Sequence, residues 1–249
     1  MEVLWFVLRL VAIIAAGYLI GNINFAILFS KLKKDDITKY GSGNPGAMNM
    51  TRTFGLGFGF LTFFTEAVKG ASAAAIGYFV LGIDGLHMLG AMIAGVSAVF
   101  GQVWPVIYKF KGGKGVATTA GVFIFATFTN WWIGIIAFAA AWIVLCIVDY
   151  GAFAAIFFLT VLASYLLATY FGEIGIMCLI LVAYFLVIYR HRENIRKMIQ
   201  GKERKMQFAK RIARVFNKNV IIDDKVDKKK EPKKEEVEIE VEIDEEPKN

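Results

Sequence analysis

Hydrophobic residues run through most of this chain in long stretches, which charged residues interrupt at only a few places. No Lys or Arg occurs between Gly70 and Tyr108, or between Gly115 and Tyr189. A run of about 20 apolar residues is enough for a helix to cross the hydrocarbon core of a bilayer. The pattern therefore predicts an all-α, polytopic membrane protein built as a helical bundle.

The breaks between the apolar stretches predict about seven transmembrane helices. The first three are expected at about residues 3–29, 56–81 and 86–108. Four more are expected in the last stretch, which turns interrupt near Asn130, Asp149 and Gly172. Each resulting piece is close to the length of one membrane-spanning helix.

Positive charge between the predicted spans is confined to alternate connections. Lys and Arg cluster at residues 31–39, at residues 109–114 and from Arg190 onward, and the intervening turns carry none. Basic residues in short loops are retained on the cytoplasmic side of a membrane. We therefore expect a multi-pass protein of the cell membrane with its N-terminus outside and its C-terminus in the cytoplasm.

Composition agrees with this class, because 57% of the residues are apolar and soluble domains usually have about 45–50%. Charge separates three regions. We expect a transmembrane domain at residues 1–200, a basic amphipathic cytoplasmic segment at residues 201–222 and a charged, disordered tail at residues 223–249. The middle segment places Met206, Ile212 and Phe216 at helical spacing among basic residues, which is typical of a helix on an anionic leaflet.

A glycine-rich loop is expected at residues 40–55. Gly41, Gly43 and Gly46 formally match the dinucleotide fingerprint G-x-G-x-x-G, but that fingerprint requires a preceding β-strand and a following helix. The apolar spans around the loop exclude such a context. Glycines nevertheless let a backbone approach a ligand closely, and polar side chains surround these. The candidate ligand contacts are Ser42, Gly43, Asn44, Asn49 and Arg52.

A second loop combines lysines with glycines at the expected start of a helix. Free N–H groups at a helix N-terminus, together with glycines and ammonium groups, are typical of a phosphate site. Charge that only fixes the topology would require the lysines but not the glycines. Gly115 stands where a Walker A motif has Ser or Thr, so nucleotide hydrolysis is not indicated. The candidate phosphate contacts are Lys111, Gly112, Gly113, Lys114, Gly115 and Thr118.

A third cluster follows the last span and contains His191 and Asn194, which share one helical face. Its arginines are equally consistent with a stop-transfer signal, but such a signal needs neither His nor Asn. His87 is distant from every basic loop and is expected to be structural. Cys146 and Cys178 lie inside apolar runs and are expected to be buried, and no metal site, disulfide or cofactor is indicated.

Glu66 and Lys69 are charged residues within the second predicted span. Charges inside a span usually face the protein interior, and residues three apart share a helical face. An internal ion pair is the favoured interpretation. The alternative is that Lys69 reaches toward the phosphate site.

Three anion-binding loops on one side of a helical bundle predict an enzyme that acts on phosphorylated substrates at the cytoplasmic leaflet. The competing hypothesis is a channel or transporter for an organic phosphate, but transporters place their site near the midplane of the membrane. A structural scaffold would not need glycine-rich basic loops. No nucleic acid partner is expected.

Together the three motifs resemble the bacterial membrane glycerol-3-phosphate acyltransferases that use acyl phosphate. The family's signatures are similar to Gly41–Asn49 with Arg52, to Phe110–Thr118 and to Arg190–Ile195 of this chain. The resemblance implies transfer of a fatty acyl group from acyl phosphate to sn-glycerol 3-phosphate. The products would be lysophosphatidic acid and inorganic phosphate, without coenzyme A or another cofactor, in the first step of phospholipid biosynthesis.

The same resemblance implies that Ser42, Arg52, His191 and Asn194 are catalytic or bind substrate, and that the loop ending at Lys114 holds a phosphate. Lys114 and Arg52 would neutralise phosphate charge. Two acceptors remain for the proton of the attacking hydroxyl: His191, or an oxygen of a bound substrate phosphate.

Two positions depart from the family pattern. Family members usually carry His where this chain has Gln102, and Asp where it has Glu66. Because His191 remains, we expect an active protein in which the missing His is not the catalytic base. The coenzyme-A-dependent acyltransferases carry a different pattern, His-x-x-x-x-Asp, which neither His87 nor His191 matches.

Overall fold

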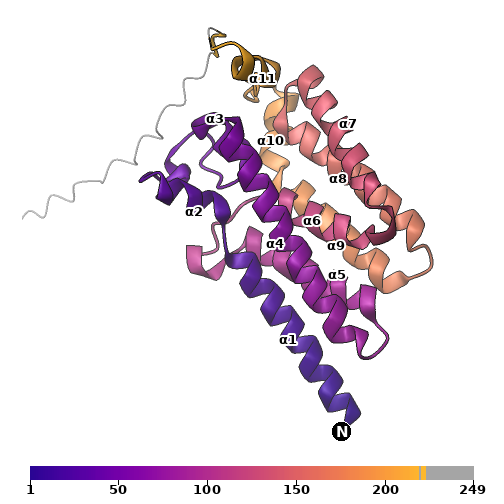
Figure 1. Ribbon diagram of the computed structural model, residues 1–249. Helices are drawn as coiled ribbons and strands as arrows, with labels where there is room; N and C mark the ends of the chain where they lie inside the picture. The colour runs from indigo at the N-terminus through magenta and orange to yellow at the C-terminus, as the bar shows by residue number, and fades with distance from the viewer. Residues whose placement is uncertain (219, 223–249) are drawn as a thin grey trace, which may run out of the picture.

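The computed structural model describes residues 1–218 and 220–222, and these residues contain helices and no β-strand (Figure 1). The predicted tail at residues 223–249 lies outside the described residues. Three short 3-10 helices accompany the α-helices. The α-helices are α1 (Glu2–Asn22), α2 (Phe25–Leu32), α3 (Ala47–Phe54), α4 (Leu56–Gly82), α5 (His87–Val103), α6 (Val116–Ala126), α7 (Trp132–Val148), α8 (Gly151–Thr169), α9 (Ile174–Arg190), α10 (Arg192–Ile199) and α11 (Phe208–Phe216).

Several helices are suited to a membrane. By length and composition, the segments Glu2–Leu32, His87–Tyr108 and Gly151–Thr169 can each cross a bilayer. Helices α9 and α10 together would form a fourth span that bends by 52°, and α6 and α7 are shorter apolar helices. The stretch predicted to hold four spans contains the four helices α6 to α9. The total of seven crossings remains a prediction.

Three elements differ from the sequence-based expectation. The first apolar segment is divided at Asn24, whose Oδ1 accepts the Ile27 N–H at 3.0 Å and so caps α2. The loop predicted at residues 40–55 contains helix α3, which packs closely on α4. The basic segment is an α-helix only in α11, and Met206 before it is fully buried rather than at a membrane surface.

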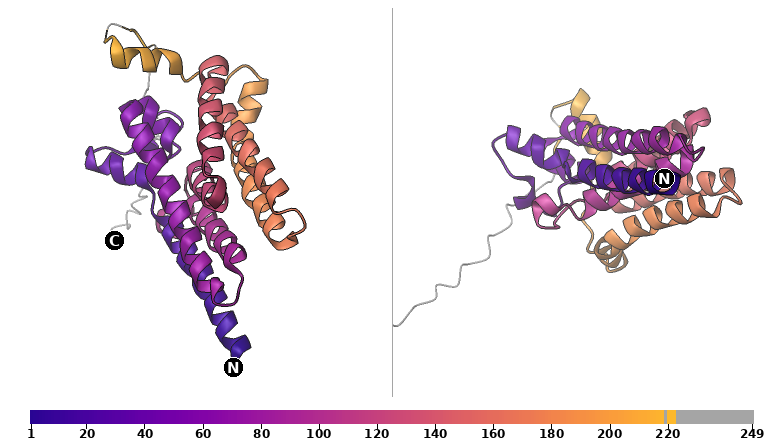
Figure 2. Two further views of the ribbon diagram at one scale, coloured as in Figure 1. Left: turned by 45° about the vertical axis from the view of Figure 1, so that its right-hand side comes forward. Right: turned by 90° about the horizontal axis from the view of Figure 1, so that it is seen from below.

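Two groups of helices form the bundle. In the first group, α4 packs against α5 and α6, and α1 packs along α5 (Figure 1). Glycines permit these close crossings: a Cβ on Gly77 would lie 2.0 Å from the Gly90 oxygen, and one on Gly121 would lie 1.8 Å from the Ala67 oxygen. The second group consists of α7, α8 and α9, and α11 lies across one end of the bundle (Figure 2).

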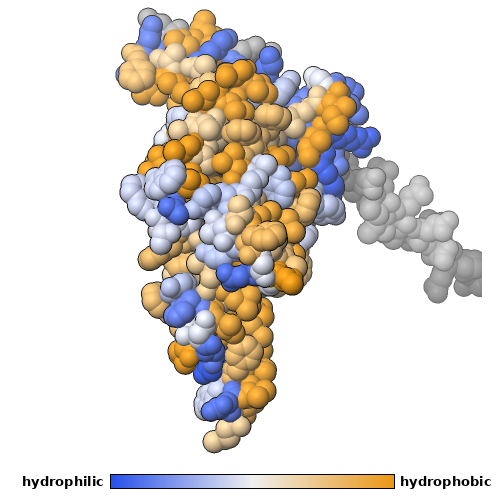
Figure 3. Space-filling view, turned by 90° about the vertical axis from the view of Figure 1, so that its right-hand side faces the viewer, coloured by the Kyte–Doolittle hydropathy of each residue, from blue (hydrophilic) through white to orange (hydrophobic). Residues whose placement is uncertain are grey.

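Hydrophobic side chains cover much of the outer surface, as expected for helices that face lipid (Figure 3). The prediction that Cys146 and Cys178 are buried is wrong, because both are exposed on this surface. In a membrane the outward face of a helix is as apolar as its inward face, so an apolar run does not indicate burial. At the end of the bundle far from α11, Arg9 of α1 pairs with Asp84 at 2.6 Å.

Charged groups of α4 stabilise the break between α1 and α2. Lys69 Nζ lies 2.5 Å from Glu66 Oε2 and donates to the carbonyl oxygens of Gly21 at 3.2 Å and Ile23 at 2.5 Å. Glu66 Oε1 accepts the Phe25 N–H at 2.8 Å. Both side chains are buried, so the predicted internal ion pair is confirmed. It satisfies backbone groups that an interrupted helix would leave without partners in the membrane.

Replacing Lys69 with Met should destabilise the protein by about 3–5 kcal/mol, because Glu66 would keep a buried charge without its partner. Thermal unfolding in a mild detergent measures the effect. The double variant Glu66→Gln, Lys69→Met is the control and should recover part of the loss, since it removes the unpaired charge. Equal stability of wild type and the Lys69→Met variant would contradict the role given to the pair.

Candidate active site

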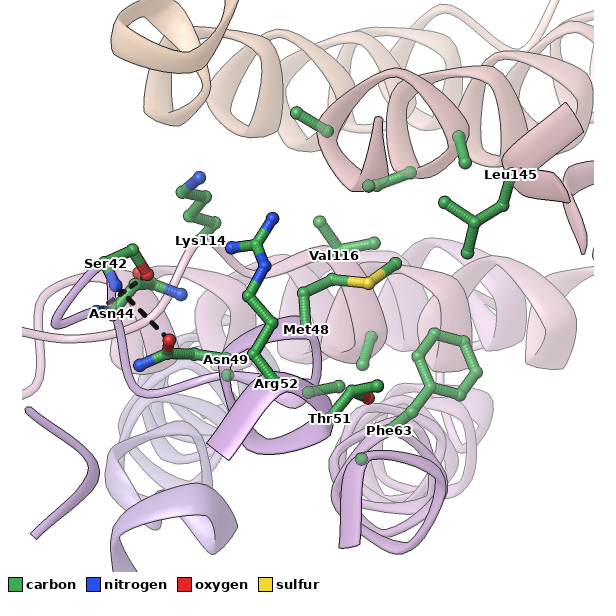
Figure 4. Close-up of a pocket in the computed structure, with 18 of the residues that line it drawn as sticks. Ser42, Asn44, Met48, Asn49, Thr51, Arg52, Phe63, Lys114, Val116 and Leu145 are labelled. Carbon is green, nitrogen blue, oxygen red and sulfur yellow. Dashed lines mark hydrogen bonds between the residues drawn. The ribbon is translucent and has the colours of Figure 1, made fainter. Parts of the chain in front are cut away.

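A cavity of about 1040 Å³ opens between the two groups of helices. Its walls come from α3, α4, α6, α7, α8, the junction of α9 with α10, and α11. In Figure 4 the polar side chains of Ser42, Asn44 and Lys114 lie toward one end, and Phe63 and Leu145 lie toward the other. This shape suits a ligand with a polar head and an apolar tail.

Most of the predicted site residues meet at this cavity. Four predicted contacts do not belong to its lining: Gly43, Lys111, Gly112 and Gly113. Lys111 is exposed, and the two glycines after it are buried behind the cavity wall. The predicted residues that line the cavity are Ser42, Asn44, Asn49, Arg52, Lys114, Gly115, Thr118, His191 and Asn194.

Asn49 holds the first loop in shape. Its side-chain amide donates to the carbonyl oxygens of Ile37 at 3.2 Å and Tyr40 at 3.0 Å. Its Oδ1 accepts the Ser42 N–H at 3.3 Å. Both amide hydrogens are used in this bracing, so contact of Asn49 with a ligand stays a prediction. The Ser42 hydroxyl accepts the Asn44 N–H at 3.3 Å and lies at the cavity.

Arg52 projects from α3 into the polar end of the cavity (Figure 4). One of its terminal nitrogens donates to the Arg204 carbonyl oxygen at 3.2 Å. Its Nε is buried and has no hydrogen-bond partner among the described residues. Burial lowers the pKa of the guanidinium, although an arginine keeps its charge in proteins. A buried cationic donor without a partner is suited to an anionic ligand.

The second loop lies against α5 at distances that only glycine allows. A Cβ on Gly112 would lie 2.2 Å from the Gln102 carbonyl oxygen, which accepts the Gly113 N–H at 3.0 Å. Arg190 donates to the carbonyl oxygens of Gly112 at 3.4 Å and Gly113 at 3.3 Å. Gly115 has a φ of +82° and caps α6. The glycines therefore place the first turn of α6, with its free N–H groups, at the cavity.

Gln102, the first of the two departures from the expected motif pattern, contacts the loop through its backbone carbonyl group and the buried ion pair through its side chain. Its Oε1 accepts a hydrogen bond from the Lys69 ammonium at 2.5 Å. Glu66, the second departure, accepts the Thr118 hydroxyl at 3.3 Å. Lys69 itself is not among the residues that line the cavity. The Gln102 side chain therefore connects α5 to α4, and the Glu66 side chain connects α4 to α6.

Lys114, Asn194 and Glu203 form a hydrogen-bonded chain at the cavity. The Lys114 ammonium donates to Asn194 Oδ1, and Asn194 Nδ2 donates to Glu203 Oε1 at 2.7 Å. Burial lowers the pKa of Lys114 to about 8, and the negative charge of Glu203 opposes this shift. Lys114 is therefore mostly charged at pH 7 and loses its charge as the pH rises through about 8.

His191 lies between α9 and α10 and is 3% exposed. Its Nδ1 is 2.8 Å from the Val187 carbonyl oxygen. Since a carbonyl oxygen only accepts, Nδ1 carries the proton and Nε2 keeps its lone pair. Burial, together with the charge of Lys114, lowers the pKa of His191 to about 4. The imidazole is therefore neutral at pH 7 and can accept a hydrogen bond.

Sequence reasoning gave no site role to Arg190 or Glu203. Arg190 belongs to the third motif, but its charge fitted a topology signal equally well, and its contact with the second loop exists only in the folded chain. Glu203 is an acidic residue flanked by Lys202 and Arg204, and this difference in charge was the one feature of the sequence that could have indicated its role. Among the described residues, no group of three or more His, Cys, Asp or Glu side chains could hold a metal ion.

A sequence model of the glycerol-3-phosphate acyltransferases matches residues 11–201, which include all three loops at the cavity. The chain belongs to this family. The glycerol-3-phosphate acyltransferase of Thermoanaerobacter sp. (strain X514) is 38% identical over 200 residues, which cover 79% of this chain and 94% of that protein. The enzyme of Aquifex aeolicus (strain VF5) is 34% identical over 194 residues, which cover 75% and 94%.

Two crystal structures of PlsY, an integral membrane glycerol 3-phosphate acyltransferase, are also similar. Both are 31% identical and cover 79% of this chain and 94% of their own. The TM-score is 0.69 for the glycerol 3-phosphate form and 0.68 for the lysophosphatidic acid form. The resemblance of the three motifs is thus confirmed: this glycerol-3-phosphate acyltransferase is a membrane enzyme of phospholipid biosynthesis, and its described residues share the helical PlsY fold.

Replacing Gly112 with Ala should reduce acyltransferase activity about a hundredfold, because displacing a substrate-positioning group by roughly 1 Å costs about that much. The added Cβ would meet the Gln102 carbonyl oxygen and push the loop away from its place. Initial rates of the purified variant measure the loss. Gly175→Ala is the control, since its Cβ would meet only a methyl group of Leu89 at 3.3 Å. An active Gly112→Ala variant would refute the packing argument.

The value of kcat/KM for acyl transfer should fall as the pH rises through about 8, because Lys114 then loses its charge. In the Glu203→Gln variant the fall should occur at a lower pH, since the carboxylate raises the pKa of Lys114 and the amide does not. A pH–rate profile from pH 6 to 10 measures both. Glu173→Gln, remote from the cavity, should leave the profile unchanged. A Glu203→Gln profile identical to wild type would exclude this coupling.

Proposed function

We propose that this acyltransferase uses acyl phosphate as donor and releases inorganic phosphate as it forms 1-acyl-sn-glycerol 3-phosphate. The observation that carries the proposal is the composition of the cavity. Its polar end holds two sets of anion-binding groups, Arg52 with the first loop and Lys114 with the first turn of α6. Two such sets suit a reaction in which donor and acceptor each carry a phosphate, and the apolar end suits a fatty chain.

The reaction proceeds by direct attack. A hydroxyl oxygen of glycerol 3-phosphate forms a bond to the carbonyl carbon of the donor, and the bond from that carbon to the phosphate oxygen breaks. Inorganic phosphate leaves with the bonding electrons, so no acyl-enzyme is required. Lys114 and Arg52 neutralise phosphate charge, while Ser42 and Asn194 orient the substrates.

Two acceptors at the cavity suit the proton of the attacking hydroxyl, the free Nε2 of His191 and an oxygen of a bound substrate phosphate. Burial and the charge of Lys114 lower the pKa of His191, and the negative charge of a bound phosphate opposes this shift. With either acceptor, His191 also orients the attacking hydroxyl.

We also infer seven membrane crossings, with the N-terminus outside and the C-terminus and active site on the cytoplasmic side. Lys114 and Arg190, which belong to two of the basic clusters, line the same cavity. The N-terminus lies at the end of α1 that points away from α3, α10 and α11 (Figure 1). Basic loops remain in the cytoplasm. Residues 1–200 then form the catalytic domain. The outer face of α11 would lie at the leaflet surface, where it exposes Val215 and Phe216 beside basic residues.

The decisive experiment is phosphate release by the purified protein with palmitoyl phosphate, with and without glycerol 3-phosphate, beside palmitoyl-coenzyme A as rival donor. We expect release that requires the acceptor, formation of lysophosphatidic acid in equal amount, and no reaction with the thioester. The Lys114→Met variant should lose this release. Transfer from palmitoyl-coenzyme A alone would overturn the proposed donor, and glycerol 3-phosphate uptake into sealed vesicles without acylation would favour a transporter.

A further inference from the structure

Helix α11 lies at the cavity but outside the part of the chain that matches the family. The family match ends at residue 201, and α11 begins at Phe208. Figure 2 shows α11 crossing the end of the bundle. Phe208, Ile212 and Phe216, which follow one another at helical spacing, belong to the cavity lining. This helix therefore contributes to the cavity although it follows the part of the chain that the family model matches.

One end of α11 is anchored to the turn between α7 and α8. The carboxylate of Asp149 in this turn accepts the N–H groups of Gln207 and Phe208, both at 3.0 Å. The Asp149 carbonyl oxygen accepts the Met206 N–H at 2.9 Å. The Phe208 ring packs edge-on against Trp142 of α7, with centroids 5.1 Å apart. The start of α11 is thus fixed by polar and aromatic contacts.

A second anchor connects α11 to α3 on the other side of the cavity. Arg211 is 6% exposed, and one of its terminal nitrogens donates to the Thr51 carbonyl oxygen at 3.1 Å. Its Nε donates to the Met206 carbonyl oxygen at 2.8 Å. An arginine on a helix that only rested on lipid headgroups would be solvated. Together with the contacts of Asp149, the hydrogen bond from Arg211 to Thr51 connects α11 both to the turn between α7 and α8 and to α3, which packs on α4.

The apolar residues of α11 share the cavity with apolar side chains of the transmembrane helices. Phe63 of α4, Leu145 of α7 and Phe158 of α8 line the same space. Ile212 packs on the cluster that contains Leu145 and Phe208. A ligand whose phosphate lies at Lys114 would place its hydrocarbon tail against the apolar side chains of this lining, to which α11 contributes.

We propose that α11 forms one wall of the acyl-chain site and that Ile212 sets the chain length which the enzyme prefers. Ile212 lies between the buried Phe208 and Phe216, which is 87% exposed. A long tail therefore passes Ile212 before it reaches the rim, whereas a short tail ends before it. The proposal rests on the proposed function insofar as the tail belongs to the acyl donor and to the lysophosphatidic acid product.

The test compares Ile212→Trp with Ala213→Trp, which introduces the same side chain at an exposed position outside the cavity lining. The ratio of kcat/KM for palmitoyl phosphate to that for decanoyl phosphate should fall by roughly tenfold or more in Ile212→Trp, since each displaced methylene costs about fourfold in affinity. Ala213→Trp should keep the wild-type ratio. The KM for glycerol 3-phosphate should change in neither variant.

Binding of palmitoyl and decanoyl lysophosphatidic acid to the same variants gives a second readout that involves no donor. If wild type does not turn over acyl phosphates, the donor proposal fails, while the binding ratio still decides the role of α11. Ile212→Ala covers the case in which the Trp variant does not fold, and it should raise the preference for stearoyl over palmitoyl chains. Unchanged ratios in the Ile212 variants, or an equal shift in Ala213→Trp, would overturn the proposal.

Discussion

The ion pair between Glu66 and Lys69 is the constraint on which the active site depends. It lies within the bundle, where a single buried charge would be costly, and each partner also binds backbone groups at the break before α2. Through Gln102, Lys69 is connected to the loop that precedes α6. One pair of side chains thus holds the turn in the first segment and connects α4 to α5, the helix against which the second loop lies.

The site consists mainly of backbone groups and of basic side chains that are partly buried. The carbonyl oxygens of Gly112 and Gly113 accept hydrogen bonds from Arg190, and Gly115 gives α6 its start at the cavity. Arg52 and Lys114 are held in partly desolvated positions, which strengthens their attraction for an anion. The carboxylate of Glu203 offsets part of the cost of keeping these charges together.

The sequence was sufficient to predict the helical membrane fold and the three motif-bearing loops, because membrane-spanning helices and glycine-rich basic loops both have recognisable local patterns. The break at Asn24 was not predictable, since apolar residues continue on both sides of it and the side chains that pair with its backbone, Glu66 and Lys69, come from α4. Helix α3 was hidden by the glycines and polar residues around it. Asn49 is a polar residue in a glycine-rich loop, so the sequence indicated a ligand contact. Its hydrogen bonds to the Ile37 and Tyr40 carbonyl oxygens exist only in the folded loop.

The dependence of the first break on α4 also has a consequence for biosynthesis. Gly21 and Ile23 are synthesised well before Lys69, and an unpaired carbonyl group in the hydrocarbon core costs several kcal/mol. The bend after α1 therefore gains its hydrogen-bond partners only once α4 has been synthesised. The cavity, whose lining includes α11, is complete only after the C-terminal part of the chain has left the ribosome.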